Sequence, residues 1–338
     1  MAESLLKSFA RTIYGATLTF GNQNEHFVNS ISKLNLVSVL CIHSVSNAEN
    51  TANPPLDVAL FQKFLDYSVL NYQITTFGNL SNLDPEGLPA LILSFDDGYG
   101  DFIEYVAPEL AARGIKANLN VIPSSIESGK PPLNVLVQDF IGTAPNELIQ
   151  KLDVPMYFGT SYSGDRLEFG LSVSKHIKDM QIEKQAEISA ELQNQLYSFQ
   201  EFQATRMLTL SELKELAHMV ELGAHSFEHA TMSRESDLYF EMDLLRCKRY
   251  FAENFKDETR IYAFPNGGFR GSQLRIAQNM GFENLLLTEG GFSSSNSNIH
   301  PRFLLYGNSL KELILRAQGR WRGAPRVRPG DYSDSRYL

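Results

Sequence analysis

The stretch Leu91-Ile92-Leu93-Ser94-Phe95-Asp96-Asp97-Gly98 decides the fold class of this chain. Its first five residues form an apolar run with the length of a buried strand. Two carboxylates stand where that strand ends, and parallel α/β folds carry their active sites at the carboxyl ends of strands. Adjacent residues that leave a strand point in different directions, so one carboxylate can bind a metal while its neighbour faces the substrate as a base. An ordinary Asp-Asp-Gly turn is the alternative interpretation.

The alternation of short apolar runs with amphipathic segments continues on both sides of this stretch. Strands are predicted at residues 36–42, 91–95, 117–122, 221–224, 261–264 and 284–287. Helices are predicted at residues 61–70, 101–113, 238–255 and 272–280, and from the capping box at 209–212 to about residue 220. Strands alternating with helices predict parallel pairing with right-handed crossovers. We therefore expect an α/β fold, a distorted (β/α)7-type barrel.

Two segments depart from this rhythm. Residues 124–206 are rich in Pro, Gly and Ser and hold a polar helix at 183–197, which predicts a long insertion of the kind from which barrels build substrate-binding loops. The domain is expected at 35–318, after an N-terminal extension at 1–34 and before an Arg-rich tail at 319–338. The tail could contact a phosphate-bearing substrate, but a solvated tail is favoured.

A second polar cluster, His225-Ser226-Phe227-Glu228-His229, follows the predicted strand at 221–224. Histidines spaced i, i+4 fall on one face of a helical turn, so both imidazoles can reach one ion. With one carboxylate they make a two-histidine, one-carboxylate metal site that keeps positions open for water and substrate. Two incidental loop histidines are the alternative, but both clusters end strands of one predicted sheet, which favours the metal site.

A third motif, Phe264-Pro265-Asn266-Gly267-Gly268, also stands at a strand end. The proline and glycines predict a tight turn whose backbone N–H groups could line an oxyanion site. Pro-Asn-Gly is a common turn, so this motif by itself is a weak signal.

Taken together, these motifs resemble those of the polysaccharide deacetylases of the NodB-homology type, carbohydrate esterase family 4. The resemblance covers most of residues 35–310 apart from the insertion, with the Asp-Asp-Gly and His-Ser-x-x-x-His motifs in order. It implies a hydrolase that removes N-acetyl groups from an amino-sugar glycan or glycan precursor in surface polysaccharide or lipopolysaccharide biosynthesis.

The resemblance also implies a role for each motif residue. Asp97, His225 and His229 match the metal ligands, and Asp96 matches the general base that acts on the metal-activated water. The turn at Pro265, Asn266 and Gly267 matches the site where a backbone N–H stabilises the oxyanion. A divalent metal is implied, with zinc as the default for such ligands and cobalt, nickel or iron as alternatives.

The chain departs from the family pattern at two places. The family's third motif has an arginine that orients the base, where this chain has Ala263, and Arg302 is a hypothetical replacement. The late motif that supplies the general acid is not evident either. A subgroup acting on poly-N-acetylglucosamine or other surface glycans has a histidine after its first strand, which His43 fits, so the general acid is either His43, which is favoured, or His300. His26, His176 and His218 are interpreted as structural or surface residues.

The composition narrows the class of protein and its compartment. Of the 338 residues, 43% are hydrophobic and 20% charged, which is ordinary for a globular protein. The net charge of -9 argues against a partner that is nucleic acid or an anionic membrane. Cys41 and Cys247 give no disulfide framework. With no signal peptide and no transmembrane segment found in the sequence, we expect a cytoplasmic enzyme.

Two alternatives to glycan deacetylation stay open at this stage. The same site could act on a non-sugar amide such as a cyclic imide or a ureide. The chain could also be a catalytically degenerate glycan-binding module, although it keeps both aspartates and both histidines of the motifs. The sequence leaves the sugar, its linkage and the oligomeric state open.

Overall fold

The fold is known from a computed structural model, which describes residues 31, 34–48, 51–84, 86–255 and 258–321. Its centre is one sheet whose strands follow the order β10-β1-β3-β4-β5-β6-β7-β9, with β2 paired to β3 and β8 to β1. The strands are β1 (Leu36–Ile42), β2 (Gln73–Thr75), β3 (Ala90–Phe95), β4 (Ala117–Val121), β5 (Val220–Ala224), β6 (Ile261–Ala263), β7 (Asn284–Leu286), β8 (Ser293–Ser294), β9 (Ile299–His300) and β10 (Phe303–Leu304).

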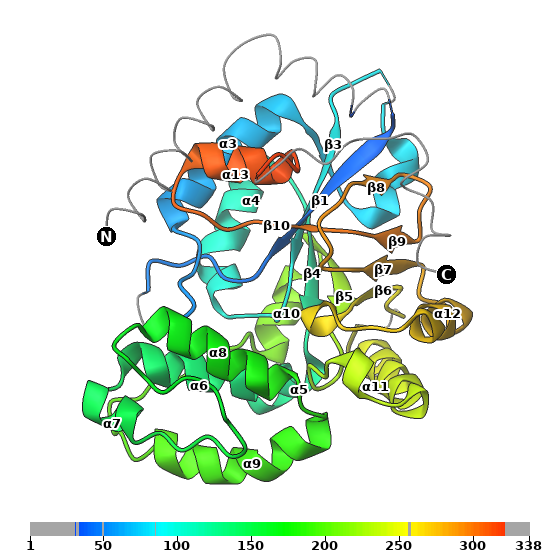
Figure 1. The fold of residues 1–338 in the computed structure, drawn as a ribbon. Helices are drawn as coiled ribbons and strands as arrows, with labels where there is room; N and C mark the ends of the chain where they lie inside the picture. Colours follow the sequence, from blue (N-terminus) through cyan, green and yellow to red (C-terminus); the bar gives the residue numbers. More distant parts are fainter. Residues whose placement is uncertain (1–30, 32–33, 49–50, 85, 256–257, 322–338) are drawn as a thin grey trace.

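Every pair along the strand order is parallel, and so is the pair of β2 with β3; among the strands of the described residues, only β8 pairs antiparallel. The first and last strands of the order, β10 and β9, are separated by only two residues, which brings the two ends of the sheet toward each other and gives a nearly closed barrel (Figure 1). The predicted α/β barrel is confirmed.

Side chains alternate between the two faces of this sheet, as a strand requires. In β1, Leu36, Leu40 and Ile42 pack in the main hydrophobic cluster, whereas Val37 and Val39 belong to a smaller cluster with Ile92. The face that carries Val37, Val39 and Ile92 therefore continues toward the strand ends with Cys41, Ser94 and Asp96. This face is apolar where the strands begin and polar where they end, which places the candidate site at the carboxyl ends.

Helices connect the strands and cover the outer face of the sheet. They are α3 (Val58–Asn71), the π-helix η2 (Phe102–Val106) continued by α4 (Ala107–Arg113), α10 (Leu210–Leu216), α11 (Asp237–Phe255), α12 (Gly271–Asn279) and α13 (Leu310–Ala317), with short 3-10 turns at Phe77–Asn82, Met232–Arg234 and Pro265–Gly267. The capping box at Thr209 and Glu212 is present. The helix it begins is shorter than predicted, because Val220 is already the first residue of β5.

Between β4 and β5 the chain forms five helices that lie together at one end of the barrel (Figure 1). They are α5 (Pro123–Ser128), α6 (Leu133–Thr143), α7 (Asn146–Gln150), α8 (Arg166–Lys178) and α9 (Ile182–Leu196). Residues of α6, α8 and α9 share a hydrophobic cluster that is separate from the main core. These helices therefore form a small packed unit beside the carboxyl ends of the strands.

The described part of the chain ends inside the predicted Arg-rich tail. Arg320 is buried, and its amide donates to Leu315 O at 2.7 Å, so the tail begins packed against α13 and not in solvent. Arg322, Arg326 and Arg328 lie outside the described residues, as do His26 and nearly all of the N-terminal extension. Among the described residues, no helix combines the length and the apolar character that crossing a membrane requires.

Candidate metal centre

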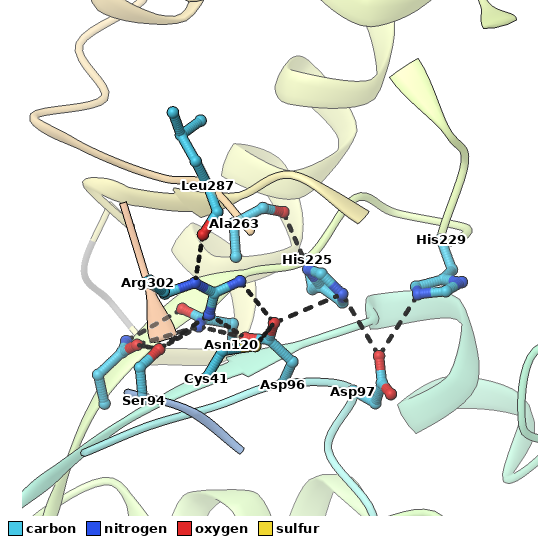
Figure 2. Close-up of polar contacts among 11 residues, drawn as sticks. Cys41, Ser94, Asp96, Asp97, Asn120, His225, His229, Ala263, Leu287 and Arg302 are labelled. Carbon is cyan, nitrogen blue, oxygen red and sulfur yellow. Dashed lines mark hydrogen bonds and ion pairs between the residues drawn. The ribbon is translucent and has the colours of Figure 1, made fainter. Parts of the chain in front are cut away.

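The two carboxylates of the first motif leave the end of β3 in different directions. The amide of Asp96 donates to Ile42 O at 2.9 Å, so Asp96 continues the pairing of β3 with β1. Asp97 then adopts a φ of 74° and Gly98 a φ of 81°, which turns the chain sharply. Both carboxylates are buried. Asp97 therefore faces the two histidines, while Asp96 points into the polar interior of the barrel (Figure 2).

The second motif follows β5 directly, as predicted, but its conformation differs from the prediction. Residues 225–230 form an irregular loop, with Ser226 at φ 57° and His229 at φ 62°, and not a helical turn. The two imidazoles still converge, with ring centroids 5.1 Å apart. The positive φ values bring the two rings together. The i, i+4 spacing therefore predicted that the histidines lie close, but a helical turn is not what brings them together.

Asp243 on α11 holds this irregular loop in place. Its carboxylate accepts hydrogen bonds from Ser226 Oγ at 2.9 Å, Phe227 N at 2.8 Å and Tyr262 Oη at 3.0 Å. Burial raises the pKa of Asp243 to about 6. Asp243 is not predictable from the sequence, because a single aspartate in an amphipathic helix is not a recognisable signal.

His225, His229 and Asp97 present one atom each to a common point. Asp97 Oδ1 lies 3.4 Å from His225 Nε2 and 3.5 Å from His229 Nε2. His225 Nδ1 contacts Ala263 O at 2.9 Å; because a carbonyl only accepts, Nδ1 carries the proton and Nε2 offers its lone pair. Burial lowers the pKa of His229 to about 3, which keeps that imidazole neutral and able to act as a ligand.

These three residues fit a divalent metal ion. Asp97 Oδ1 is buried and has no hydrogen-bond partner among the described residues, although it faces both histidines. An orphaned carboxylate oxygen is costly unless something positive binds it. Ligand atoms 3.4 to 3.5 Å apart suit an ion bonded to each at about 2.0–2.2 Å.

Asp96 is held by Arg302, from the segment between β9 and β10. Arg302 Nη1 donates to Asp96 Oδ1 at 2.8 Å and Nη2 donates to Oδ2 at 2.7 Å, which is a bidentate pair (Figure 2). Arg302 is completely buried, and its Nε donates to Leu287 O at 3.0 Å. Burial alone would raise the pKa of Asp96, but the Arg302 guanidinium holds it below the ordinary value. The structure thus places a guanidinium on Asp96 from the segment between β9 and β10, which lies outside the third motif.

Two polar residues of the barrel interior complete the surroundings of Asp96. Asn120 Nδ2 donates to Asp96 Oδ1 at 2.8 Å and to Ser94 Oγ at 3.1 Å, and Cys41 Sγ lies 3.4 Å from Asp96 Oδ2. Asn120 was not among the residues predicted for the site. A signal was available, because Asn118 and Asn120 alternate with apolar residues in β4 and so share one face of the strand.

The two candidates for a general acid lie in different surroundings. His43 follows β1 and offers a ring nitrogen within 4.8 Å of ligand atoms of Cys41 and Asp96. Its side chain is exposed, although the protein around the ring desolvates it enough to lower its pKa. His300 is fully buried, and its ring nitrogens lie 2.6 Å from Ser293 Oγ and 3.0 Å from Asn284 Oδ1. This environment is that of a structural histidine. Of the two candidates for the general acid, His43 is therefore favoured.

The third motif forms the predicted tight turn next to the irregular segment 225–231, which we call the histidine loop. Asn266 has a φ of 57° and Gly267 a φ of 70°, and a Cβ on Gly267 would lie 1.9 Å from Thr288 Oγ1. Asn266 Nδ2 donates to Thr231 Oγ1 at 2.9 Å, which ties the turn to the loop of the second motif. Only a glycine fits the position of Gly267.

Backbone strain concentrates in these motifs. Of the six non-glycine residues that the described part of the chain places at positive φ, four belong to the three motifs. They are Asp97, Ser226, His229 and Asn266. Such conformations cost about 1–3 kcal/mol each and persist where the surrounding structure imposes them, often at functional sites.

Comparison with known proteins gives a match to one family model and to a curated relative. Residues 200–285 match the family model described as polysaccharide deacetylase, and this segment contains the second and third motifs. YxkH of Bacillus subtilis (strain 168), whose description names a polysaccharide deacetylase, is 23% identical over 94 residues, which are 28% of this chain and 34% of YxkH. The alignment thus spans about a third of that relative.

Two solved structures share the fold over most of the chain. The deacetylase PplD of Streptococcus pyogenes, in complex with acetate, matches with a TM-score of 0.56 and 18% identity, covering 84% of this chain and 98% of PplD. IcaB of Ammonifex degensii matches with a TM-score of 0.54 and 15% identity, covering 84% of this chain and 97% of IcaB. The resemblance to the polysaccharide deacetylases, a family of hydrolases that act on N-acetyl amide bonds, is confirmed.

Proposed function

We propose that this chain is a metal-dependent N-deacetylase that acts on an amino-sugar glycan or a glycan precursor. The observation that carries the proposal is the arrangement of two carboxylates whose nearest partners differ. Asp97 shares a buried point with His225 and His229, while Asp96, one residue earlier, is paired with Arg302. Amide hydrolysis needs these two functions, a Lewis acid and a base, side by side.

Asp97, His225 and His229 would hold the metal. When bound there, a divalent ion supplies a Lewis acid and lowers the pKa of water. Zinc is the default ion for two imidazoles and one carboxylate, and cobalt, nickel and iron also suit this ligand set.

Asp96 is proposed as the general base that takes a proton from the attacking water. The bidentate pair with Arg302 and the hydrogen bond from Asn120 keep its carboxylate ionised and fixed in orientation. Arg302 thereby positions the base. Ala263, which stands where the family pattern has an arginine, has no side chain that could do so. At the turn, the amides of Gly267 and Gly268 donate to Phe264 O and Pro265 O, which makes the Asn266 amide our candidate donor to the oxyanion.

His43 is proposed as the general acid that protonates the leaving amine. His43→Ala should lower kcat by about 10²–10⁴-fold, the usual contribution of acid catalysis, with metal content unchanged. Acetate release measured beside metal analysis checks this expectation. The control is His218→Ala, because His218 is an exposed histidine in the turn that follows α10. Near-full turnover of His43→Ala would exclude His43 as the general acid and leave His300 as the candidate.

The test of the whole proposal is acetate release from an N-acetylglucosamine oligomer. Protein reconstituted with zinc should release acetate, a chelator should abolish the release, and added zinc should restore it. Chelator-sensitive hydrolysis of a cyclic imide or a ureide, without acetate release from the oligomer, would replace the glycan with a non-sugar amide. Binding of the oligomer without hydrolysis would identify a binding module.

A further inference from the structure

His43 lies in a segment that is attached to the first motif on both sides of the histidine. Before His43, Ile42 O accepts a hydrogen bond from the amide of Asp96 at 2.9 Å. After His43, the amide of Val45 donates to Asp101 Oδ2 at 3.0 Å. The backbone that carries the imidazole is therefore fixed at both ends to the segment that carries the proposed base.

The second of these attachments is made by one carboxylate oxygen. Asp101 Oδ2 accepts from Ser44 Oγ as well as from the amide of Val45, so it binds both residues that follow His43. Val45 is completely buried and pairs with Leu56 in an isolated bridge, and both side chains belong to the main hydrophobic cluster. Apolar burial thus keeps this segment folded, while Asp101 sets the position of its first residues.

Asp101 does not serve the helix that it precedes. It takes the N-cap position before η2, where an aspartate usually accepts from the first N–H groups of its own helix, but it makes no such hydrogen bond. Its carboxylate instead reaches Ser44 and Val45, which are 57 and 56 residues away in the sequence. The side chain of Asp101 therefore connects two segments at the site.

The backbone next to Asp101 is itself fixed by Arg206. The amide of Gly100 donates to Arg206 O at 2.7 Å, and Arg206 Nη2 donates to Gly100 O at 3.0 Å. A Cβ on Gly100 would lie 2.5 Å from Arg206 Cζ, so the two segments are in close contact. Asp97 belongs to the same turn of the chain, which places Asp101 at a fixed distance from the metal ligand.

The position of His43 depends on its backbone, because its ring has little other support. The side chain is exposed, and within the described residues its ring makes no hydrogen bond. A general acid must come within about 2.6–3.2 Å of the atom that it protonates. A displacement of about 1 Å can cost about 10²-fold in rate, so whatever holds this backbone affects catalysis.

We propose that Asp101 is a positioning residue for the deacetylation, which holds the backbone after His43 so that the imidazole reaches the leaving amine. This inference rests on the proposed function, in which His43 is the general acid. Asp101 acts through His43 and not on the substrate. The segment from Asp96 to Asp101 then carries three carboxylates with three tasks, which are to act as the base, to bind the metal and to place the acid.

The test compares two substrates of the zinc-loaded full chain. The N-acetylglucosamine oligomer expels an amine that must be protonated, whereas 4-nitrophenyl acetate expels a phenolate that needs no acid. Asp101→Ala should lower kcat for the oligomer about 10- to 100-fold, with KM, zinc content and ester hydrolysis changed by less than about twofold. Asp101→Asn should keep most of the activity, because its amide oxygen can still accept both hydrogen bonds. Ser44→Ala removes one of the two and should show a smaller loss of the same kind.

Two comparisons show whether the loss acts through His43. In the His43→Ala variant, Asp101→Ala should cause no further loss, as expected for two residues that act as a unit. Glu221→Ala is the matched control, because the Glu221 carboxylate also binds two residues of a distant segment, accepting from the amides of Phe77 and Gly78, but near the beginning of β5. It should leave the ratio of oligomer turnover to ester turnover unchanged.

An equal loss on both substrates would overturn the inference, and so would a further loss in the His43→Ala variant, because Asp101 would then act on the metal centre or on the fold. Unchanged acetate release by a folded Asp101→Ala variant would also overturn it and leave the proposed function standing. A wild type that releases no acetate from the oligomer would refute the proposed function, and this inference with it.

Discussion

Asp97→Ala is expected to reduce bound zinc from about one ion per chain to almost none, and to abolish acetate release with it. The reason is that Asp97 supplies the only carboxylate oxygen found between the two imidazoles within the described residues. Two histidines alone form a weak site, because structural and catalytic zinc sites usually use at least three protein ligands. Metal analysis after zinc reconstitution and desalting measures the first effect, and an acetate assay measures the second.

Asp96→Asn is the matched variant for this experiment. It should keep the metal, because Asp96 is engaged by Arg302 and is not among the three residues that face the common point. It should still lose about 10²–10⁴-fold in kcat, since an amide cannot act as a base. Equal loss of metal in both variants would contradict the assignment of separate roles to the two carboxylates.

Arg302→Met is expected to destabilise the fold by about 3–5 kcal/mol, the cost of leaving one member of a buried ion pair without its partner. Both side chains of the pair are almost completely buried, at 0% and 1% exposed. The measurement is the free energy of unfolding in denaturant. Arg113→Met is the control, because Arg113 pairs with Asp66 near the surface and should contribute no more than about 1 kcal/mol.

The same pair predicts a pH dependence and a rescue. The Arg302 guanidinium holds the pKa of Asp96 below its ordinary value of 3.8, so the pair stabilises the fold above that pH and less as the pH falls further. Without Arg302, burial raises the pKa of Asp96 above its ordinary value, so the deficit of Arg302→Met should begin to shrink above pH 4 and should shrink further below it. In the double variant with Asp96→Asn, no unpaired charge remains, so stability should partly return. Additive losses in the double variant would show that the two residues are not coupled.

The sequence by itself determined the fold class and the three motifs. Strands and helices with strong hydrophobic periodicity were predicted to within a few residues, because burial on one face is a local property of the sequence. The boundary of α10 was missed where an apolar residue, Val220, belonged to the next strand. The motif residues stand directly after predicted strands, and parallel strands bring their carboxyl ends to one edge of a sheet.

The tertiary structure alone decided the surroundings of those motifs. Arg302 reaches Asp96 across 206 residues of sequence, because near closure of the barrel brings the segment between β9 and β10 beside β1 and β3. The histidine loop converges through positive φ angles that no spacing rule predicts. The end of α8 lies beside Thr231 because the Lys178 carbonyl accepts a hydrogen bond from the Thr231 hydroxyl, 53 residues further along the chain. Contacts between distant segments depend on how the elements pack, and that information is not present in any local pattern of residues.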